Sequence, residues 1–207
     1  MIQTLSLFRP LNAHLLELLG GLTPADWDRP TVARKWTVKD VAAHLLDGNI
    51  RAISTYRDQV EIRLETKIDG YLQLVEYLNN LNAEWVKAMK RVSPKILLQW
   101  LEDTHDGYIQ CLEALDLLAP ARFSVAWAGD EVSPNWFHIA REYTEKWHHQ
   151  QQIRQAVGRP GLFTREFYHP ALATFFRALP HQYRNAQANT GTRILIEVTP
   201  KVVGHGV

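Results

Sequence analysis

The sequence predicts an all-α protein: an antiparallel four-helix bundle with extra helices and a short C-terminal strand-like segment. Apolar residues recur at intervals close to 3.6 over most of the first 187 residues, which is the period of an amphipathic helix. Ser-Pro or Thr-Pro pairs, which favour helix starts, occur at 23–24, 93–94 and 133–134. The connections between the predicted helices are short, and long helices with short connections favour antiparallel packing.

The helix boundaries follow from local signals. The first helix covers residues 4–19 and stops at a Gly-Gly pair, and a short helical turn then covers residues 23–27. Thr37 is the predicted N-cap of a long helix that runs toward residue 65, with Asp40 as its capping-box partner. The remaining predicted helices cover residues 71–91, 93–118, 133–158 and 170–188.

The C-terminal segment breaks the helical pattern. Residues 192–199 read T-R-I-L-I-E-V-T, a β-branched run that is typical of a strand. A single strand is not stable alone, so we expect it to pair in a dimer, to lie across the bundle or to begin another domain. We assign residues 1–190 to the bundle and residues 191–207 to an extension that could be the start of a missing or truncated second domain.

Composition excludes several classes of protein. The chain has 207 residues, 23 Lys and Arg against 22 Asp and Glu, and no run of like charge, so it offers no nucleic-acid tract. Its single cysteine, Cys111, excludes an internal disulfide framework and a thiolate metal cage. We find no targeting segment and no apolar stretch of roughly 18 residues, so we expect a cytoplasmic protein without membrane contact. Nine histidines are many for this length.

Four side chains that can bind a metal share one stripe of the helix predicted over 133–158. At about 100° per residue, His138, Glu142, Glu145 and His149 fall within about 60° of one another. Glu145 and His149 are four residues apart, so their side chains lie about 5–6 Å apart and can reach one ion. Imidazole and carboxylate ligands suit zinc or another divalent transition metal, such as nickel. The same pair could instead be a solvated ion pair on an exposed face.

A third ligand has to come from another helix, and His44 is the candidate. It lies beside the apolar seam of the helix that begins at Thr37, so its ring is expected to point toward the bundle interior. Three protein ligands leave positions open for water or substrate, which is typical of a catalytic metal site. By pattern alone, a histidine beside an apolar seam is more often a hydrogen-bonded core residue.

Four further residues have candidate roles near this site. His138 and Glu142 could orient the ligands or transfer protons. Arg141 could bind a substrate carboxylate or form a surface ion pair. Trp36 could stack on a substrate, although such tryptophans are more often core residues.

Two segments carry a family resemblance. Residues 36–45 and 141–154 resemble the DinB/YfiT-like superfamily of four-helix bundles, and more narrowly the metal-binding domain of mycothiol-dependent maleylpyruvate isomerases. Trp36, Asp40 and His44 match a W-x-x-x-D-x-x-x-H pattern on the second helix of that family. Glu145 and His149 match the E-x-x-x-H pattern of its later helix. Residues 176–184 resemble the end of the domain, so the resemblance covers most of residues 5–190.

The resemblance implies a DinB-like bundle in which His44, Glu145 and His149 bind a divalent metal. It also implies an enzyme that uses a low-molecular-weight thiol such as mycothiol, bacillithiol or glutathione on a small electrophilic substrate, as an isomerase or S-transferase. The isomerases carry a second α+β domain after the bundle, and only the strand-like segment follows it here. The alternatives are a metal-dependent hydrolase and a non-catalytic, stress-linked metal-binding bundle. Bundles of this type often pair, so we expect a homodimer.

Overall fold

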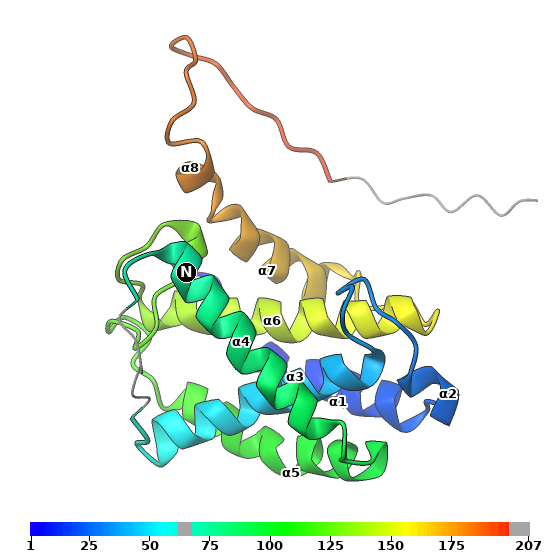
Figure 1. Cartoon of the computed structure of the whole chain (residues 1–207). Coiled ribbons are helices and arrows are strands. Elements are labelled where there is room, and N and C mark those ends of the chain that lie inside the picture. The colour runs from blue at the N-terminus through cyan, green and yellow to red at the C-terminus, as the bar shows by residue number, and fades with distance from the viewer. Residues whose placement is uncertain (62–67, 199–207) are drawn as a thin grey trace, which may run out of the picture.

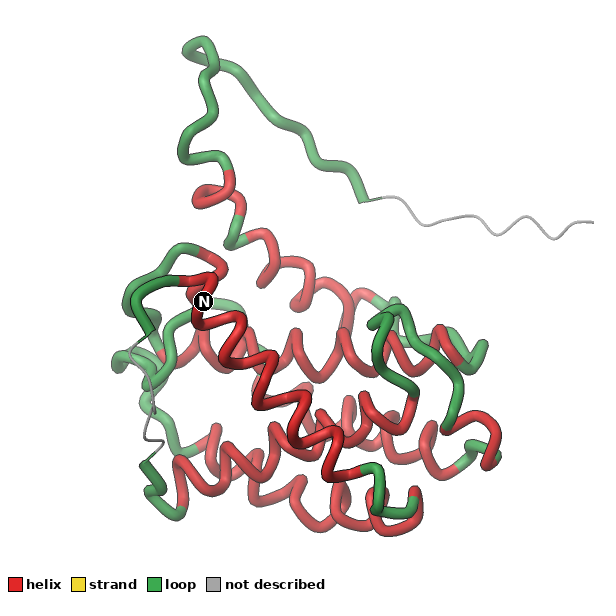
Figure 2. Tube along the Cα trace, viewed as in Figure 1, coloured by secondary structure: helices red, strands yellow, loops and turns green. Residues whose placement is uncertain are grey.

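The computed structural model describes residues 1–61 and 68–198 and has the all-α fold that the sequence predicts (Figure 1; Figure 2). No helix in these two ranges is long and apolar enough to cross a membrane. In chain order the elements are η1 (Leu5–Leu7), α1 (Phe8–Gly20), α2 (Pro24–Trp27), α3 (Val38–Ala52), η2 (Ile53–Arg57), α4 (Tyr71–Met89), α5 (Pro94–Glu113), η3 (Ala126–Ala128), α6 (Asn135–Ala156), α7 (Arg165–Phe176) and α8 (Leu179–Gln182).

Four long helices form the bundle core. Helix α3 packs against α5 and α6, and α1 packs against the same two helices from the other side. Helix α4 lies on the outside of α3, and α7 lies on α6 (Figure 1). In Figure 1, α3 runs in the direction opposite to α6. This arrangement places the helix of His44 beside the helix of Glu145 and His149.

Helix α3 is the central helix of the bundle. It contacts α2, α4, α5 and α6, and apolar residues on several of its faces are fully buried. Ala42 and Ala43 are small as well as buried, so neighbouring helices can approach closely there. A side chain on this helix is therefore held by packing on several sides. The fully buried apolar residues of α3 are Val38, Val41, Ala42 and Leu46.

The N-terminus of α3 has the capping box that the sequence predicts. The Thr37 amide and hydroxyl donate to the Asp40 carboxylate at 3.0 and 2.9 Å, and the Asp40 amide donates to Thr37 Oγ1 at 3.3 Å. Lys90 adds an ion pair, with its Nζ 2.7 Å from Asp40 Oδ1. These bonds satisfy amide groups that a helix start otherwise leaves without partners.

The helix predicted to run toward residue 65 ends earlier, at Arg57 in the π-helical turn η2. Gln59 has a left-handed backbone with φ of 57°, and the Val60 amide donates to the Ser54 carbonyl at 2.9 Å. The left-handed residue and this hydrogen bond end the helix, as is common at helix C-termini. Residues 62–65 lie outside the described residues.

Two boundaries around the loop before α6 also differ from the prediction. Helix α5 ends at Glu113 instead of residue 118, because the Asp116 side chain accepts the Leu118 amide at 3.0 Å and forms a local turn. Helix α6 begins at Asn135, and Ser133 is not its N-cap. The Ser133 hydroxyl instead accepts the Val125 amide and donates to Asp130, both at 2.9 Å.

The helix predicted over 170–188 is replaced by α7 and α8. Helix α7 begins at Arg165, five residues before Pro170, so the proline lies inside the helix instead of opening it. Phe167 is buried against the bundle, and its carbonyl accepts the Tyr143 hydroxyl of α6 at 2.8 Å. This tertiary contact outweighs the helix-breaking tendency of the proline.

The strand-like segment forms no strand in its described part, residues 192–198. These residues are exposed, including the apolar side chains of Ile194, Leu195 and Ile196. No described segment pairs with them, and the β-branched pattern alone cannot satisfy their backbone groups. Residue 199 lies outside the described ranges. The domain boundary at residue 190 stays a prediction.

The capping box of α3 leads to a stability prediction. Asp40→Asn should lower the free energy of unfolding by about 1–2 kcal/mol at pH 7, because the helix start loses a charged acceptor. Burial acts to raise the pKa of Asp40, but hydrogen bonds from Lys90 and Thr37 outweigh it, so the net pKa is lowered. Chemical denaturation of wild type and variant at several pH values measures the difference.

The sign of the pH dependence follows from the lowered pKa. The Asp40 carboxylate stabilises the fold above the pKa it has in the unfolded chain, and this stabilisation is lost as the pH falls through the folded-state pKa. The difference between wild type and variant should therefore shrink below about pH 4. Asp103→Asn, at an exposed position of α5, is the control and should change stability by less than about 0.5 kcal/mol. A difference that is equal at pH 7 and pH 3 would contradict this account.

Candidate metal centre

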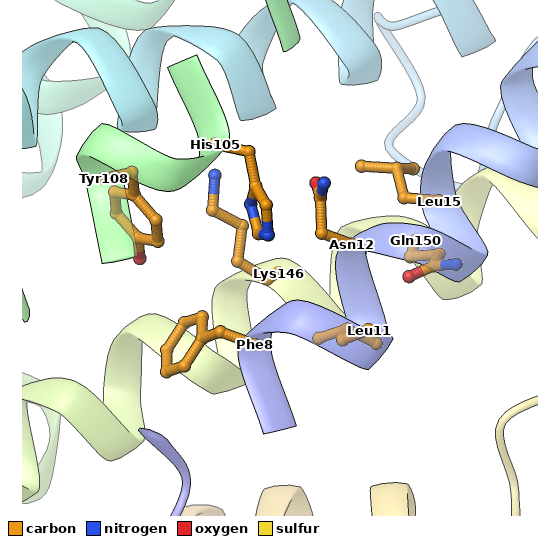
Figure 3. A pocket seen from close by; sticks show the side chains of 8 residues that line it. All are labelled: Phe8, Leu11, Asn12, Leu15, His105, Tyr108, Lys146 and Gln150. Carbon is orange, nitrogen blue, oxygen red and sulfur yellow. The ribbon is translucent and has the colours of Figure 1, made fainter. Parts of the chain in front are cut away.

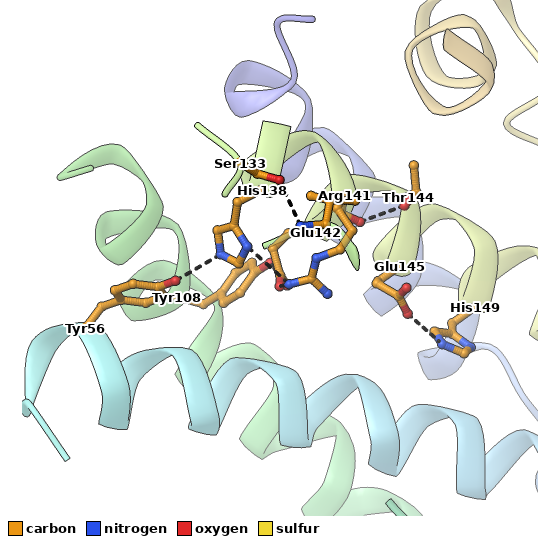
Figure 4. Close-up of polar contacts among 10 residues, drawn as sticks. Tyr56, Tyr108, Ser133, His138, Arg141, Glu142, Thr144, Glu145 and His149 are labelled. Carbon is orange, nitrogen blue, oxygen red and sulfur yellow. Dashed lines mark hydrogen bonds and ion pairs between the residues drawn. The ribbon is translucent and has the colours of Figure 1, made fainter. Parts of the chain in front are cut away.

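The structure brings together the three residues that the sequence singles out as metal ligands. His44 of α3 and Glu145 and His149 of α6 each offer a ligand atom, and these atoms lie within 4.8 Å of one another. The imidazole centroids of His44 and His149 are 4.7 Å apart. His149 Nε2 is 3.3 Å from Glu145 Oε2, the contact that Figure 4 shows. Within residues 1–61 and 68–198, no other His, Cys, Asp or Glu belongs to this group.

The cluster is closed on one side and open on the other. The side chain of His149 is 13% exposed, whereas that of Glu145 is 45% exposed. Trp36 covers the imidazoles, with its ring centroid 5.0 Å from that of His44 and 6.3 Å from that of His149. Thr31 holds this tryptophan in place, because its amide and hydroxyl donate to the Trp36 carbonyl at 3.0 and 2.9 Å.

Burial keeps His44 in the form that binds metals. Burial first, and then the nearby His149, lower the pKa of His44 to about 3, so the imidazole is neutral at physiological pH. His44 Nδ1 is buried without a hydrogen-bond partner. Burial acts to raise the pKa of Glu145, but the hydrogen bond with His149 outweighs it, so the net pKa is lowered and the carboxylate is ionised.

A glutamine that the sequence analysis missed determines which nitrogen of His149 faces the cluster. Gln152 Oε1 lies 2.9 Å from His149 Nδ1, and Gln152 Nε2 donates to His148 Nε2 at 3.0 Å. Because an amide oxygen can only accept, Nδ1 of His149 carries a hydrogen, and in the neutral ring Nε2 then presents its lone pair. The signal was its spacing, three residues after His149 on the same face of α6.

This tautomer makes the cluster fit a cation. In the neutral form of this ring, the Nε2 lone pair and the ionised carboxylate of Glu145 face each other across 3.3 Å. Two electron-rich atoms repel each other at this distance unless a positive charge lies between them, which is either a proton on Nε2, giving an ion pair with Glu145, or a metal ion in its place. A divalent metal bound by two imidazole nitrogens and one carboxylate oxygen meets that need, and the unpartnered His44 nitrogen is consistent with it.

His138 and Glu142 lie around Arg141 in a separate network at the N-terminal half of α6 (Figure 4). Arg141 Nη2 lies 3.2 Å from His138 Nδ1, and His138 Nε2 lies 3.0 Å from the Tyr56 hydroxyl. A guanidinium can only donate, so Nδ1 accepts and the Nε2–H donates to Tyr56. Burial lowers the pKa of His138 to about 4, which keeps the ring neutral.

Glu142 completes this network as an ionised acceptor. It accepts hydrogen bonds from Arg141 and, at 3.0 Å, from the Tyr108 hydroxyl. Burial acts to raise the pKa of Glu142, but the charge of Arg141 outweighs it and the pKa falls to about 2. Arg141 is thus held by an internal ion pair, and its Nε is buried without a partner.

A small cavity between α1, α5 and α6 borders the Glu142 network at Tyr108, but none of the three candidate ligands lines it (Figure 3). It leaves about 10 Å³ for the centre of a water molecule, which is room for about one water. A thiol or an organic substrate therefore does not fit there, and any chemistry on such molecules has to take place elsewhere. Its lining residues are Phe8, Leu11, Asn12, Leu15, His105, Tyr108, Lys146 and Gln150.

The role of Gln152 can be tested by metal affinity. Gln152→Leu should weaken zinc binding about 10- to 100-fold, because His149 loses the acceptor that fixes its tautomer. Gln151→Leu is the matched control, since the Gln151 side chain donates to the Gly161 carbonyl, away from the cluster, and it should bind zinc as the wild type does. Competition titration against a chelator measures both. Equal affinity of the two variants would show that Gln152 does not orient the ligand.

Comparison with known proteins adds the family. The model of the family described as mycothiol maleylpyruvate isomerase N-terminal domain matches residues 8–154, which is more than half of the chain and includes all three candidate ligands. No curated protein and no solved structure matches the chain. The bundle and the family match agree with the resemblance that the sequence motifs carry. The chain therefore belongs to the family of mycothiol maleylpyruvate isomerase N-terminal domains, the DinB-like helical bundles.

Proposed function

We propose that this protein is a divalent-metal-dependent enzyme that uses a low-molecular-weight thiol on a small electrophilic substrate. His44, Glu145 and His149 would hold the metal, and zinc suits this donor set, with nickel as the alternative. When bound, such a metal lowers the pKa of a coordinated thiol, so that the thiolate is available at neutral pH. The observation that carries the proposal is the three-ligand cluster with its exposed Glu145 side.

The residues around the cluster favour an open site over a closed structural one. A structural zinc site usually has a fourth protein ligand. The nearest histidines on α6 are engaged elsewhere: His148 accepts from Gln152, and His138 is bonded to Tyr56 and Arg141. A fourth position would thus be available to a thiol or a substrate.

Trp36 and Arg141 are the proposed substrate-binding residues. The Trp36 ring lies against both candidate imidazole ligands, so it would form an apolar wall beside a bound thiol. Arg141 is 24% exposed and would attract an acidic group of the substrate. We propose that His138 and Glu142 act mainly by holding the Arg141 guanidinium, because each is bonded to it.

The chemistry can end in two ways. The thiolate sulfur forms a bond to one carbon of an activated double bond, and the π electron pair moves to the neighbouring carbon. If that pair re-forms the double bond and expels the thiolate after rotation about the single bond, the product is an isomer. If the carbon takes a proton instead, the thiol stays attached and the reaction is an S-transfer.

Thiol binding tests this function. The protein loaded with Co²⁺ in place of zinc should gain a sulfur-to-cobalt charge-transfer band when mycothiol, bacillithiol or glutathione is added. The band should saturate at one thiol per metal for at least one of the three, because the cluster leaves a ligand position open. Absorbance titration gives the affinity, and His44→Ala should show no band, since it removes a ligand.

The alternatives predict different results in the same experiment. A metal-dependent hydrolase would give no sulfur band but would cleave activated esters when loaded with zinc. A non-catalytic metal-binding bundle would give neither signal. Either result would contradict the thiol-dependent function.

A further inference from the structure

Lys146 follows Glu145 directly on α6, and its side chain reaches α3. Its ammonium group donates to the backbone carbonyl of Leu45 at 2.9 Å and to the side-chain oxygen of Asn49. Leu45 is the residue after His44. A single side chain therefore connects the two ligand-bearing helices at positions adjacent to one candidate ligand on each helix.

The Lys146 ammonium group is surrounded by a buried acceptor and an aromatic ring. Asn49 is buried, and its amide nitrogen donates to Thr104 Oγ1 of α5 at 3.0 Å, which turns its oxygen toward Lys146. The Thr104 hydroxyl donates in turn to the Trp100 carbonyl at 2.6 Å. The Lys146 Nζ also lies 4.6 Å from the centre of the Tyr108 ring, which is within range of a cation–π contact (Figure 3).

Gly48 leaves room for this arrangement on the surface of α3. A Cβ atom at position 48 would lie 3.7 Å from Lys146 Nζ, which is van der Waals contact, so the ammonium group lies directly over the backbone of this glycine. The α3 face between Leu45 and Asn49 is thus open to a side chain that comes from α6.

General stability does not explain such a contact. A charged group at a helix interface loses hydration, and an apolar side chain of the same length often stabilises a fold as well or better. The contact instead makes the helix pairing specific. Its hydrogen bonds form only at one rotation of α6 about its axis and one position of α6 along α3. A shift of α6 by one residue turns its side chains by about 100° and moves them by about 1.5 Å. Such a shift would separate Glu145 and His149 from His44.

We propose that Lys146 is a positioning residue of the metal centre. It fixes the register of α6 against α3 through Leu45 and Asn49, and so holds His44 opposite Glu145 and His149. This inference rests on the proposed metal site.

Lys146→Met tests the proposal, because methionine keeps the apolar stem and removes the ammonium group. The variant should fold, and its affinity for Co²⁺ alone should fall about 10- to 100-fold, the range for residues that orient metal ligands. The absorption bands of bound Co²⁺ should also change in position and intensity, since they report ligand geometry. Asn49→Asp keeps an acceptor for Lys146, and the Thr104 hydroxyl can donate to its second oxygen in place of the lost amide contact, so this variant should retain the wild-type affinity and spectrum. Asn49→Leu should behave like Lys146→Met.

Lys90→Met is the matched control. Lys90 also donates to a side chain of α3, that of Asp40 at 2.8 Å and one helical turn before His44, but it does not connect α3 to α6. This variant should lower the thermal unfolding midpoint and leave Co²⁺ affinity and spectrum unchanged. If Lys146→Met binds Co²⁺ with wild-type affinity and spectrum, the positioning role is wrong. If His44→Ala also binds like the wild type, the metal site itself is wrong, and the two failures are thereby distinguished.

Discussion

The contact between α3 and α6 is the constraint on which the candidate site depends. Helix α3 is surrounded by α2, α4, α5 and α6, so it has little freedom to turn or slide. Its partly buried His44 therefore presents a neutral imidazole in one place. Helix α6 meets that place with a carboxylate and a second imidazole, four residues apart on one face. Packing of apolar residues thus fixes the positions of the polar ones.

The four polar side chains that share a stripe of α6 do not act as one group. About 11 residues separate His138 from His149, which is roughly 16 Å along a helix, so one ion cannot reach both. The C-terminal half of the stripe joins His44, and the N-terminal half surrounds Arg141. The structure shows this division because it gives the height of each side chain relative to the neighbouring helices, whereas helical angles give only the face.

Local signals in the sequence were enough to predict the bundle, the capping box of α3 and the residues of the candidate cluster. They were not enough where distant residues compete with local preferences. Phe167 packs on α6, and α7 continues through Pro170 instead of beginning there. The Ser133 hydroxyl bonds to a loop instead of capping α6. The contact of Lys146 with Leu45 joins residues 101 positions apart. No periodicity encodes such a pairing, and the orientation of the Gln152 amide depends on His148 as well as on His149.

The most direct test of this account is the metal content of the protein purified without chelator. Elemental analysis should find about one divalent metal per chain in the wild type and in His105→Ala, a half-buried histidine of α5 outside the cluster. It should find little or none in His44→Ala and in the Glu145→Ala/His149→Ala double variant, because each lacks part of the donor set. No metal in the wild type after zinc is added back, or equal metal in all four proteins, would contradict the claim that these three residues form a metal centre.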